Sequence, residues 1–193
     1  MTGDALLYGL SGVLSASAPL LFGVIGETIT EKAGVSNLAM NGMILLSAMG
    51  GFAASLATGS LALGFLAGAA IGAAVAAVVA FTSITLKQSQ VAVGYVLAML
   101  CRDLAYFLGN PIMGMNGPRL NLLPIPGLSA IPVVGTLLFR HDVVTYASFF
   151  LIFAAWFYME RTRPGIMLRG LGENPRAAYV RGANVGRQRY LYT

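Results

Sequence analysis

Long apolar stretches, separated by short polar breaks, fill the chain as far as residue 159. A helix needs about twenty apolar residues to cross the hydrocarbon core of a bilayer, and these stretches reach or approach that length, the last being the shortest. They are residues 5–26, 34–58, 60–86, 91–109 and 143–159. The pattern predicts an all-α protein, a polytopic transmembrane helical bundle of about five spans.

The segment between the last two stretches, residues 110–142, is broken repeatedly by proline and glycine. These residues are Pro111, Gly114, Gly117, Pro118, Pro124, Pro126, Gly127, Pro132 and Gly135. Proline lacks a backbone donor and clashes with the preceding turn, so no continuous helix is expected here. Because the segment is still apolar, we expect it to fold against the membrane.

Composition supports a membrane protein. Hydrophobic residues make up 57% of the chain and charged residues only 10%, whereas about one-quarter of a soluble domain is charged. Cys101 is the single cysteine and His141 the single histidine, which excludes an internal disulfide and a clustered Cys/His metal site. We interpret Cys101 as a small apolar residue and place His141 in an exposed loop. No metal, cofactor or catalytic residue is predicted.

Lysine and arginine fall unevenly on the two sides of the predicted spans. With the N-terminus outside, the outer segments hold only Arg119 and Arg140. The inner segments hold Lys32, Lys87, Arg161, Arg163, Arg169, Arg176, Arg181, Arg187 and Arg189. Short cytoplasmic loops collect such residues, so we expect an external N-terminus, a transmembrane region at 1–159 and a cytoplasmic segment at 160–193. Topology then explains the net charge of +5, and no nucleic-acid partner is expected.

A stripe of small residues marks the third stretch. Gly64, Gly68 and Gly72 are four apart and continue as Ala76 and Ala80. Such a stripe lies on one helix face and lets another helix approach closely, so we interpret the glycines as a packing seam. An alanine-rich span can also produce the stripe by chance.

Uncharged polar residues in the spans are candidates for a solute pathway, since polar groups are costly in lipid. Asn37 and Asn41 lie one turn apart, on the same face of the helix expected from the second stretch. They could hydrogen-bond a polar solute or tie neighbouring helices together, and the sequence leaves both open. Gln90 and Tyr95 are further candidates for the pathway.

Two charges, Arg102 and Asp103, interrupt the fourth stretch. Adjacent helical residues point in different directions, so we expect the two side chains to need separate partners. Arg102 can extend its charged head toward the outer interface, and a structural role is favoured for the pair.

The charged segment 160–193 contains a helix start signal. In Gly172-Glu173-Asn174-Pro175-Arg176-Ala177-Ala178-Tyr179, Asn174 is a capping residue and Pro175 takes the first helical position. Glu173 and Arg176 are three apart and are expected on one helix face. The pattern predicts a short surface helix, which could meet a partner protein or lie on anionic lipid.

Four stretches carry a resemblance to a known family. They are GETITEKAGVSNLAMNGMILLSAMGGF (26–52), LKQSQVAVGYVLAML (86–100), LPIPGLSAIPVVGTLLF (123–139) and RTRPGIMLRGLGENPRAAYVRGANV (161–185). Together they resemble the permease subunits of nucleoside and simple-sugar ATP-binding-cassette (ABC) importers, of the ribose and branched-chain amino acid permease superfamily. The resemblance implies that a coupling helix docking into the ATPase comprises Glu173, Asn174, Pro175, Arg176, Ala177 and Ala178.

The resemblance further implies a multi-pass permease of the cytoplasmic (inner) membrane that moves a nucleoside or simple sugar by alternating access. Its implied partners are an ABC ATPase, a second permease subunit in a homo- or heterodimer, and an extracytoplasmic solute-binding protein. The phosphate-binding pattern G-x-x-x-x-G-K-[ST] does not occur in the sequence, in keeping with ATP hydrolysis by a separate chain.

The chain departs from the family in two ways. Asn41 stands before Gly42, where many relatives have a glutamate, and family permeases are longer, so we expect the chain to be a fragment. The competing class is a secondary transporter or channel driven by an ion gradient, for which Asp103 is the candidate intramembrane acid. No His/Asp/Glu cluster or serine–base pair supports a membrane-embedded enzyme.

Overall fold

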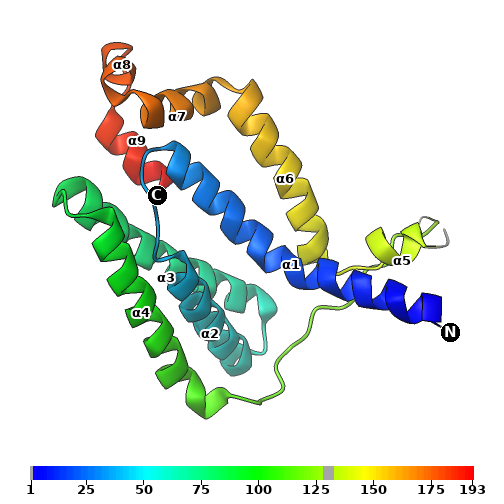
Figure 1. Ribbon diagram of the computed structural model, residues 1–193. Coiled ribbons are helices and arrows are strands. Elements are labelled where there is room, and N and C mark those ends of the chain that lie inside the picture. Colours follow the sequence, from blue (N-terminus) through cyan, green and yellow to red (C-terminus); the bar gives the residue numbers. More distant parts are fainter. Residues whose placement is uncertain (1, 128–132) are drawn as a thin grey trace. The chain divides into compact units, whose positions relative to one another are not determined.

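The computed structural model describes residues 2–127 and 133–193, and all regular structure within them is helical (Figure 1). Five helical segments in these residues are long and apolar enough to cross a membrane. They are Ala5–Lys32, Met40–Thr58, Leu61–Thr85, Gln90–Ile112 and Val143–Arg161. The predicted class and number of spans are therefore confirmed, and the protein is a multi-pass membrane protein.

The long helices are α1 (Thr2–Lys32), α2 (Met40–Thr58), α3 (Leu61–Ala80), α4 (Gln90–Gly109) and α6 (Val143–Arg161). The short ones are η1 (Phe81–Thr85), η2 (Asn110–Ile112), α5 (Val134–Leu138), α7 (Arg163–Glu173), α8 (Pro175–Val180) and α9 (Val185–Tyr192). By contacts the chain forms two compact units, one of Met1–Ile25 with Leu120–Tyr158, the other of Gly26–Arg119 with Met159–Thr193.

The second span begins later than predicted. Residues 34–39 are not helical, and α2 starts at Met40 rather than at Gly34. Gly34 has a φ of 82°, a left-handed conformation that ends α1 and that glycine adopts without strain. The apolar pattern continues across this loop, so hydropathy alone extends the span too far.

The third span ends in a π-helical turn, η1. The hydroxyls of Thr82 and Ser83 donate to the carbonyl oxygens of Val78 and Val79, at 2.7 and 2.6 Å. Such side-chain bonds compete with the backbone ladder of the helix. The span therefore leaves regular α-helix at Ala80.

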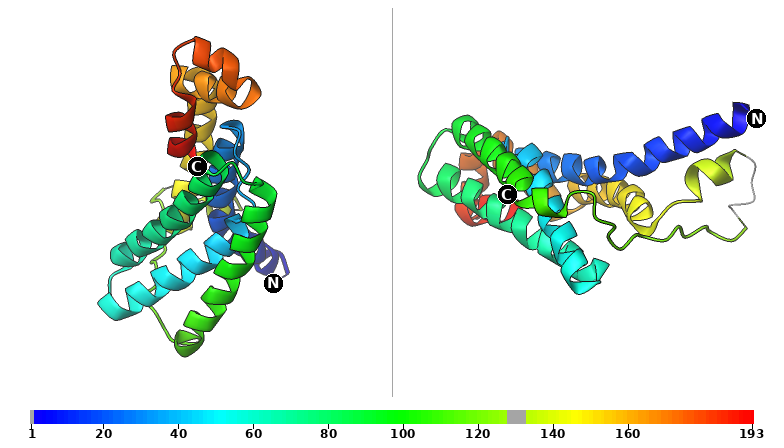
Figure 2. Two further views of the ribbon diagram at one scale, coloured as in Figure 1. Left: turned by 90° about the vertical axis from the view of Figure 1, so that its left-hand side faces the viewer. Right: turned by 90° about the horizontal axis from the view of Figure 1, so that it is seen from below.

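In the larger unit α2 packs against both α3 and α4, and the three helices lie together in every view of Figures 1 and 2. A Cβ atom placed on Gly64 would lie 2.8 Å from the carbonyl oxygen of Gly51 in α2. Cβ atoms on Gly68 and Gly72 would approach Ser47 to 3.1 and 3.3 Å. Glycine at these positions thus lets the α2 and α3 backbones come close together.

The smaller unit contains His141, and here the expectation of an exposed loop is wrong. His141 is 0% exposed. Its Nε2 donates to the carbonyl oxygen of Leu137 at 2.7 Å, and Nδ1 lies 2.8 Å from the hydroxyl of Ser15 in α1. When the ring carries its only proton on Nε2, Nδ1 accepts from that hydroxyl. The histidine is buried because a partner distant in sequence satisfies its second nitrogen.

The broken segment 110–142 forms no continuous helix among its described residues, as predicted. The backbone N–H groups of Leu123 and Ile125 donate to the carbonyl oxygens of His141 and Phe139, at 2.9 and 3.2 Å. The segment folds back on itself just before α6.

Candidate functional site

Three short helices, α7, α8 and α9, follow α6 and together form the candidate docking site of the larger unit (Figure 1). Each begins at a polar capping side chain: Thr162 Oγ1, Asn174 Oδ1 and Asn184 Oδ1 accept from backbone N–H groups three residues on, at 3.2, 3.1 and 3.1 Å. Capping satisfies orphan donors that a short helix could not satisfy otherwise. The short helix predicted from Asn174 and Pro175 is present as α8, with Pro175 in its first turn.

A groove of about 430 Å³ runs between α7 and α8. Its lining comprises Arg163, Ile166, Met167, Gly170, Glu173, Asn174, Ala177, Ala178 and Arg181. Four of the six predicted coupling residues thus line one concave surface, while Pro175 and Arg176 do not. Ile166 and Met167 make it apolar, and two arginines and one glutamate add charge. Such a groove can receive an apolar side chain of a partner and pair with charges around it.

One part of the predicted arrangement is wrong. Glu173 and Arg176 do not share one helix face, because Glu173 ends α7 and Arg176 belongs to α8. Asn174 between them has φ −145° and ψ 85°, which breaks the helix. The capping residue therefore separates the two charges into different helices.

The α7–α9 segment is hydrogen-bonded to, and packed against, the end of α1 and the loop that follows it. Arg189 Nε donates to the carbonyl oxygen of Ala33 at 3.3 Å, and Thr30 Oγ1 donates to that of Tyr192 at 3.1 Å. A Cβ atom on Gly172 would lie 2.4 Å from the carbonyl oxygen of Lys32, so α7 approaches the end of α1 very closely. α7 and α9 thus both contact the end of α1 and the start of the loop at residues 33–39.

The same loop is joined to α4. Gln90 Oε1, in the first turn of α4, accepts from the backbone N–H of Ser36 at 3.0 Å. The backbone N–H of Asn37 donates to Glu27 Oε1 of α1, also at 3.0 Å. The loop is thus bonded to α1 and α4 as well as leading into α2.

The structure does not bring the four candidate pathway residues together at one place. Asn37 lies in the loop before α2 and not on its helical face; it is 4% exposed, and its Oδ1 accepts from Ala39 N at 3.2 Å. Asn41 lies in the first turn of α2 and is exposed, as is Tyr95 in α4. The interpretation of Asn37 and Asn41 as a pair on one helix face is therefore wrong.

Opposite results are expected for the two asparagines. Asn37→Ala removes a buried acceptor and lowers the free energy of unfolding by about 1 kcal/mol. Asn41→Ala leaves that free energy unchanged but raises the half-saturating solute concentration for uptake. Unfolding in detergent and uptake into vesicles measure the two effects. Lower stability with normal uptake in Asn41→Ala would show that this side chain ties helices together instead.

The expectation of separate partners for Arg102 and Asp103 is also wrong. Arg102 Nε donates to Asp103 Oδ1 at 3.0 Å, and the side chains are 47% and 68% exposed. Although adjacent Cβ atoms point apart on a helix, the long arginine side chain bends back to its neighbour.

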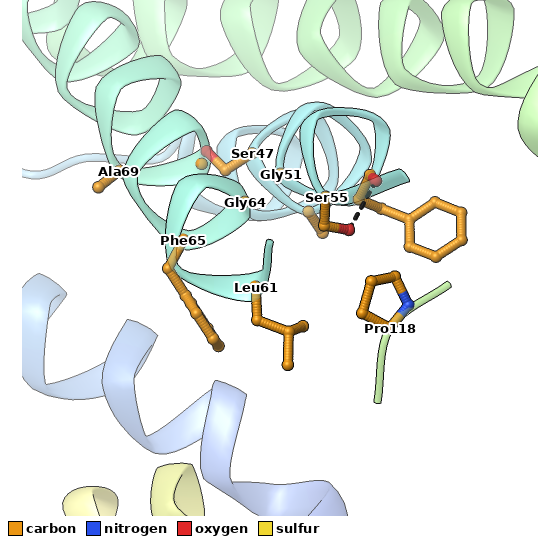
Figure 3. A pocket seen from close by; sticks show the side chains of 11 residues that line it. Ser47, Gly51, Ser55, Leu61, Gly64, Phe65, Ala69 and Pro118 are labelled. Carbon is orange, nitrogen blue, oxygen red and sulfur yellow. Dashed lines mark hydrogen bonds between the residues drawn. The ribbon is translucent and has the colours of Figure 1, made fainter. Parts of the chain in front are cut away.

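A cavity that was not predicted from the sequence lies between α2 and α3 (Figure 3). It measures about 470 Å³, and Leu61, Phe65 and Pro118 give it a mostly apolar wall. Ser47 and Ser55 supply hydroxyls, of which Ser55 donates to the carbonyl oxygen of Phe52 at 2.8 Å. The four-residue spacing of Ser47, Gly51 and Ser55 on one helix face is the signal that could have found it.

Comparison with known proteins connects these features to a family. The sequence model of the family described as branched-chain amino acid transport system / permease component matches residues 9–192. A putative glucose ABC transporter permease protein, TsgC13 of Haloferax volcanii, is 37% identical over 186 residues, covering 94% of this chain and 56% of that protein. No solved structure matches the chain.

Two further relatives are 30% identical. One is the nucleoside ABC transporter permease protein NupC of Lactococcus lactis, and the other the guanosine ABC transporter permease protein NupQ of Bacillus subtilis. Each match covers 91% of this chain and 59% of the relative. The chain therefore spans less than two-thirds of the length of the curated relatives it matches.

Proposed function

Because the chain belongs to the branched-chain amino acid transport system / permease component family, we propose that it is the transmembrane permease subunit of an ABC importer. In this role it moves a small polar solute, a nucleoside or a simple sugar, across the cytoplasmic membrane. The names of the three relatives, which are glucose, nucleoside and guanosine ABC transporter permeases, support this substrate class. The family consists of transport subunits, and ATP hydrolysis falls to a partner chain.

The observation that carries the proposal is the capped helix α8 beside its groove. ABC transporters need a rigid element through which the ATPase moves the permease, and α8 is short, capped and held by α7 and α9. The exposed Tyr179 and Val180 leave apolar surface next to the groove for a partner. We assign the ATPase to this surface, with a second permease subunit and an extracytoplasmic binding protein completing the importer.

The connections of α8 suggest how ATP hydrolysis acts on the solute pathway. The ATPase displaces α8, and α7 and α9 pass the movement to residues 33–39 through Gly172 and Arg189. From there it reaches α2 directly and α4 through Gln90. Differential binding of the ATPase in its two states thus biases the helices between outward- and inward-open arrangements.

We also propose an orientation with residues 1–159 in and around the membrane, the N-terminus outside and residues 160–193 in the cytoplasm. A cysteine at Val180, which is 85% exposed, should react with an impermeant maleimide only after the cells are permeabilised. Leu122→Cys, in the segment expected outside, should react in intact cells. Cys101 is first replaced by alanine in both variants. Labelling of Val180→Cys in intact cells would show that the orientation is the opposite of the proposed one.

A further inference from the structure

The exposed surface of α4 divides into a sector that holds polar and charged side chains and an apolar sector. An α-helix turns by about 100° per residue. On this basis one arc of about 100° around α4 holds Tyr95, Met99, Arg102, Asp103 and Tyr106. The neighbouring arc holds Val96, Leu100, Leu104 and Phe107, all exposed and all apolar. The opposite face carries the buried Gly94, Cys101 and Ala105. Two different environments are therefore expected around the exposed part of this helix.

Contact with lipid is unfavourable for the polar sector. The Arg102–Asp103 bond uses only Nε and Oδ1, so the terminal nitrogens of Arg102 and the second oxygen of Asp103 have no partner within the described part of the chain. Asp103 lies about 9 Å before the end of α4, at 1.5 Å per residue, which its short side chain cannot bridge to the membrane surface. Unsatisfied charged groups at such depth are costly, so they face water or a polar ligand.

We infer that the polar sector of α4 lines the solute pathway and forms a binding subsite for a neutral polyhydroxylated solute, with Arg102 and Asp103 as its hydrogen-bonding pair. This inference rests on the proposed function. Asp103 can accept from a hydroxyl while Arg102 donates to the neighbouring one, a pattern that fits a vicinal diol. Along the helix axis Tyr95 and Tyr106 are the first and last residues of the sector, and their aromatic faces can stack on a sugar or base ring.

The charge of the pair decides between solute classes. Arg102 and Asp103 neutralise one another, so the subsite carries no net charge to hold an ion. For an anionic solute the attraction of Arg102 is offset by repulsion from Asp103, and for a cationic solute the reverse holds, whereas a neutral solute uses both side chains as hydrogen-bond partners. A neutral ligand forms no ion pair with either side chain. It can therefore leave the subsite easily, and release of the solute is part of transport.

Accessibility of α4 tests the location of the subsite. In the assembled importer, in membrane vesicles and with Cys101→Ala, single cysteines replace Met99 and Tyr106 in the polar sector and Leu100 in the apolar sector. Leu100 is the matched control because it is 52% exposed. A charged methanethiosulfonate should modify the first two cysteines rapidly and Leu100→Cys slowly. Equal, slow modification of all three would overturn the inference, because lipid or a packed helix would then cover this face.

Protection by solute tests binding. Glucose and guanosine serve as neutral probes, and the probe that the vesicles accumulate with ATP should slow modification of Met99→Cys and Tyr106→Cys. Asp103→Asn should raise the half-saturating concentration of that probe about tenfold, the effect of losing a charge-assisted hydrogen bond, while Leu100→Ala leaves it unchanged. Uptake without protection would overturn the subsite and leave the proposed function intact, whereas absence of ATP-driven uptake would count against the proposed function itself.

Discussion

Ala177→Trp and Arg176→Glu should each abolish binding of the ATPase and solute uptake, while membrane insertion stays normal. Ala177 is exposed and lines the groove between α7 and α8, so an indole there fills space in the groove proposed to receive the ATPase. Arg176 is exposed on the same helix, and its reversal places a negative charge against the partner. Neither residue lies in a candidate span. Co-purification of the permease with its ATPase in detergent, followed by uptake in vesicles, measures both effects.

Two matched variants separate a lost docking surface from a general effect. Arg187→Glu makes the same charge reversal at an exposed position of α9 rather than α8, and should leave binding of the ATPase intact. Ala177→Ser keeps the residue small and should also bind. If Ala177→Trp and Arg176→Glu both retained the ATPase and transported normally, α8 would be a helix of the lipid surface and its assigned role would be wrong.

Gly42→Ala should destabilise the larger unit by about 3 kcal/mol or more, since overpacking against a backbone cannot be relieved by a side-chain rotation. A Cβ atom on Gly42 would lie 2.2 Å from the carbonyl oxygen of Ala98 and 2.8 Å from its Cα, where α2 crosses α4. The two helices must separate to admit a single methyl group. The free energy of unfolding in detergent micelles measures the effect.

Gly26→Ala is the control for this prediction. Nothing lies within 4 Å of a Cβ atom at Gly26, which is an interior residue of α1. Alanine there should raise the free energy of unfolding by up to about 1 kcal/mol, because glycine is the poorer helix former. Equal stability of the two variants would show that α2 and α4 do not approach as closely as the structure has them.

The sequence predicted features that depend on local pattern. Five hydrophobic runs predicted the spans, because the length of an apolar helix is set by the bilayer and read directly from the residues. Asn174 and Pro175 predicted the start of α8, because a cap and a first-turn proline act within three residues. Both features are decided by neighbours along the chain.

Features that depend on distant partners could not be predicted in this way. His141 is buried because it meets Ser15, 126 residues away, and no local pattern shows that contact. The late start of α2 follows from the left-handed Gly34, while the apolar pattern runs through the loop unchanged. Contact between Gly172 and Lys32, which connects the docking site to the spans, likewise appears only in three dimensions.

The dependence of uptake on ATP hydrolysis tests the central proposal most directly. Vesicles containing the permease, its ATPase and the binding protein are loaded with ATP and supplied with labelled glucose or guanosine, with and without ionophores that abolish ion gradients. An ABC importer should show uptake that requires hydrolysable ATP, persists with the ionophores and is lost in Ala177→Trp. Uptake that continues without ATP and stops when the ion gradients are abolished would contradict the proposal and identify a secondary transporter.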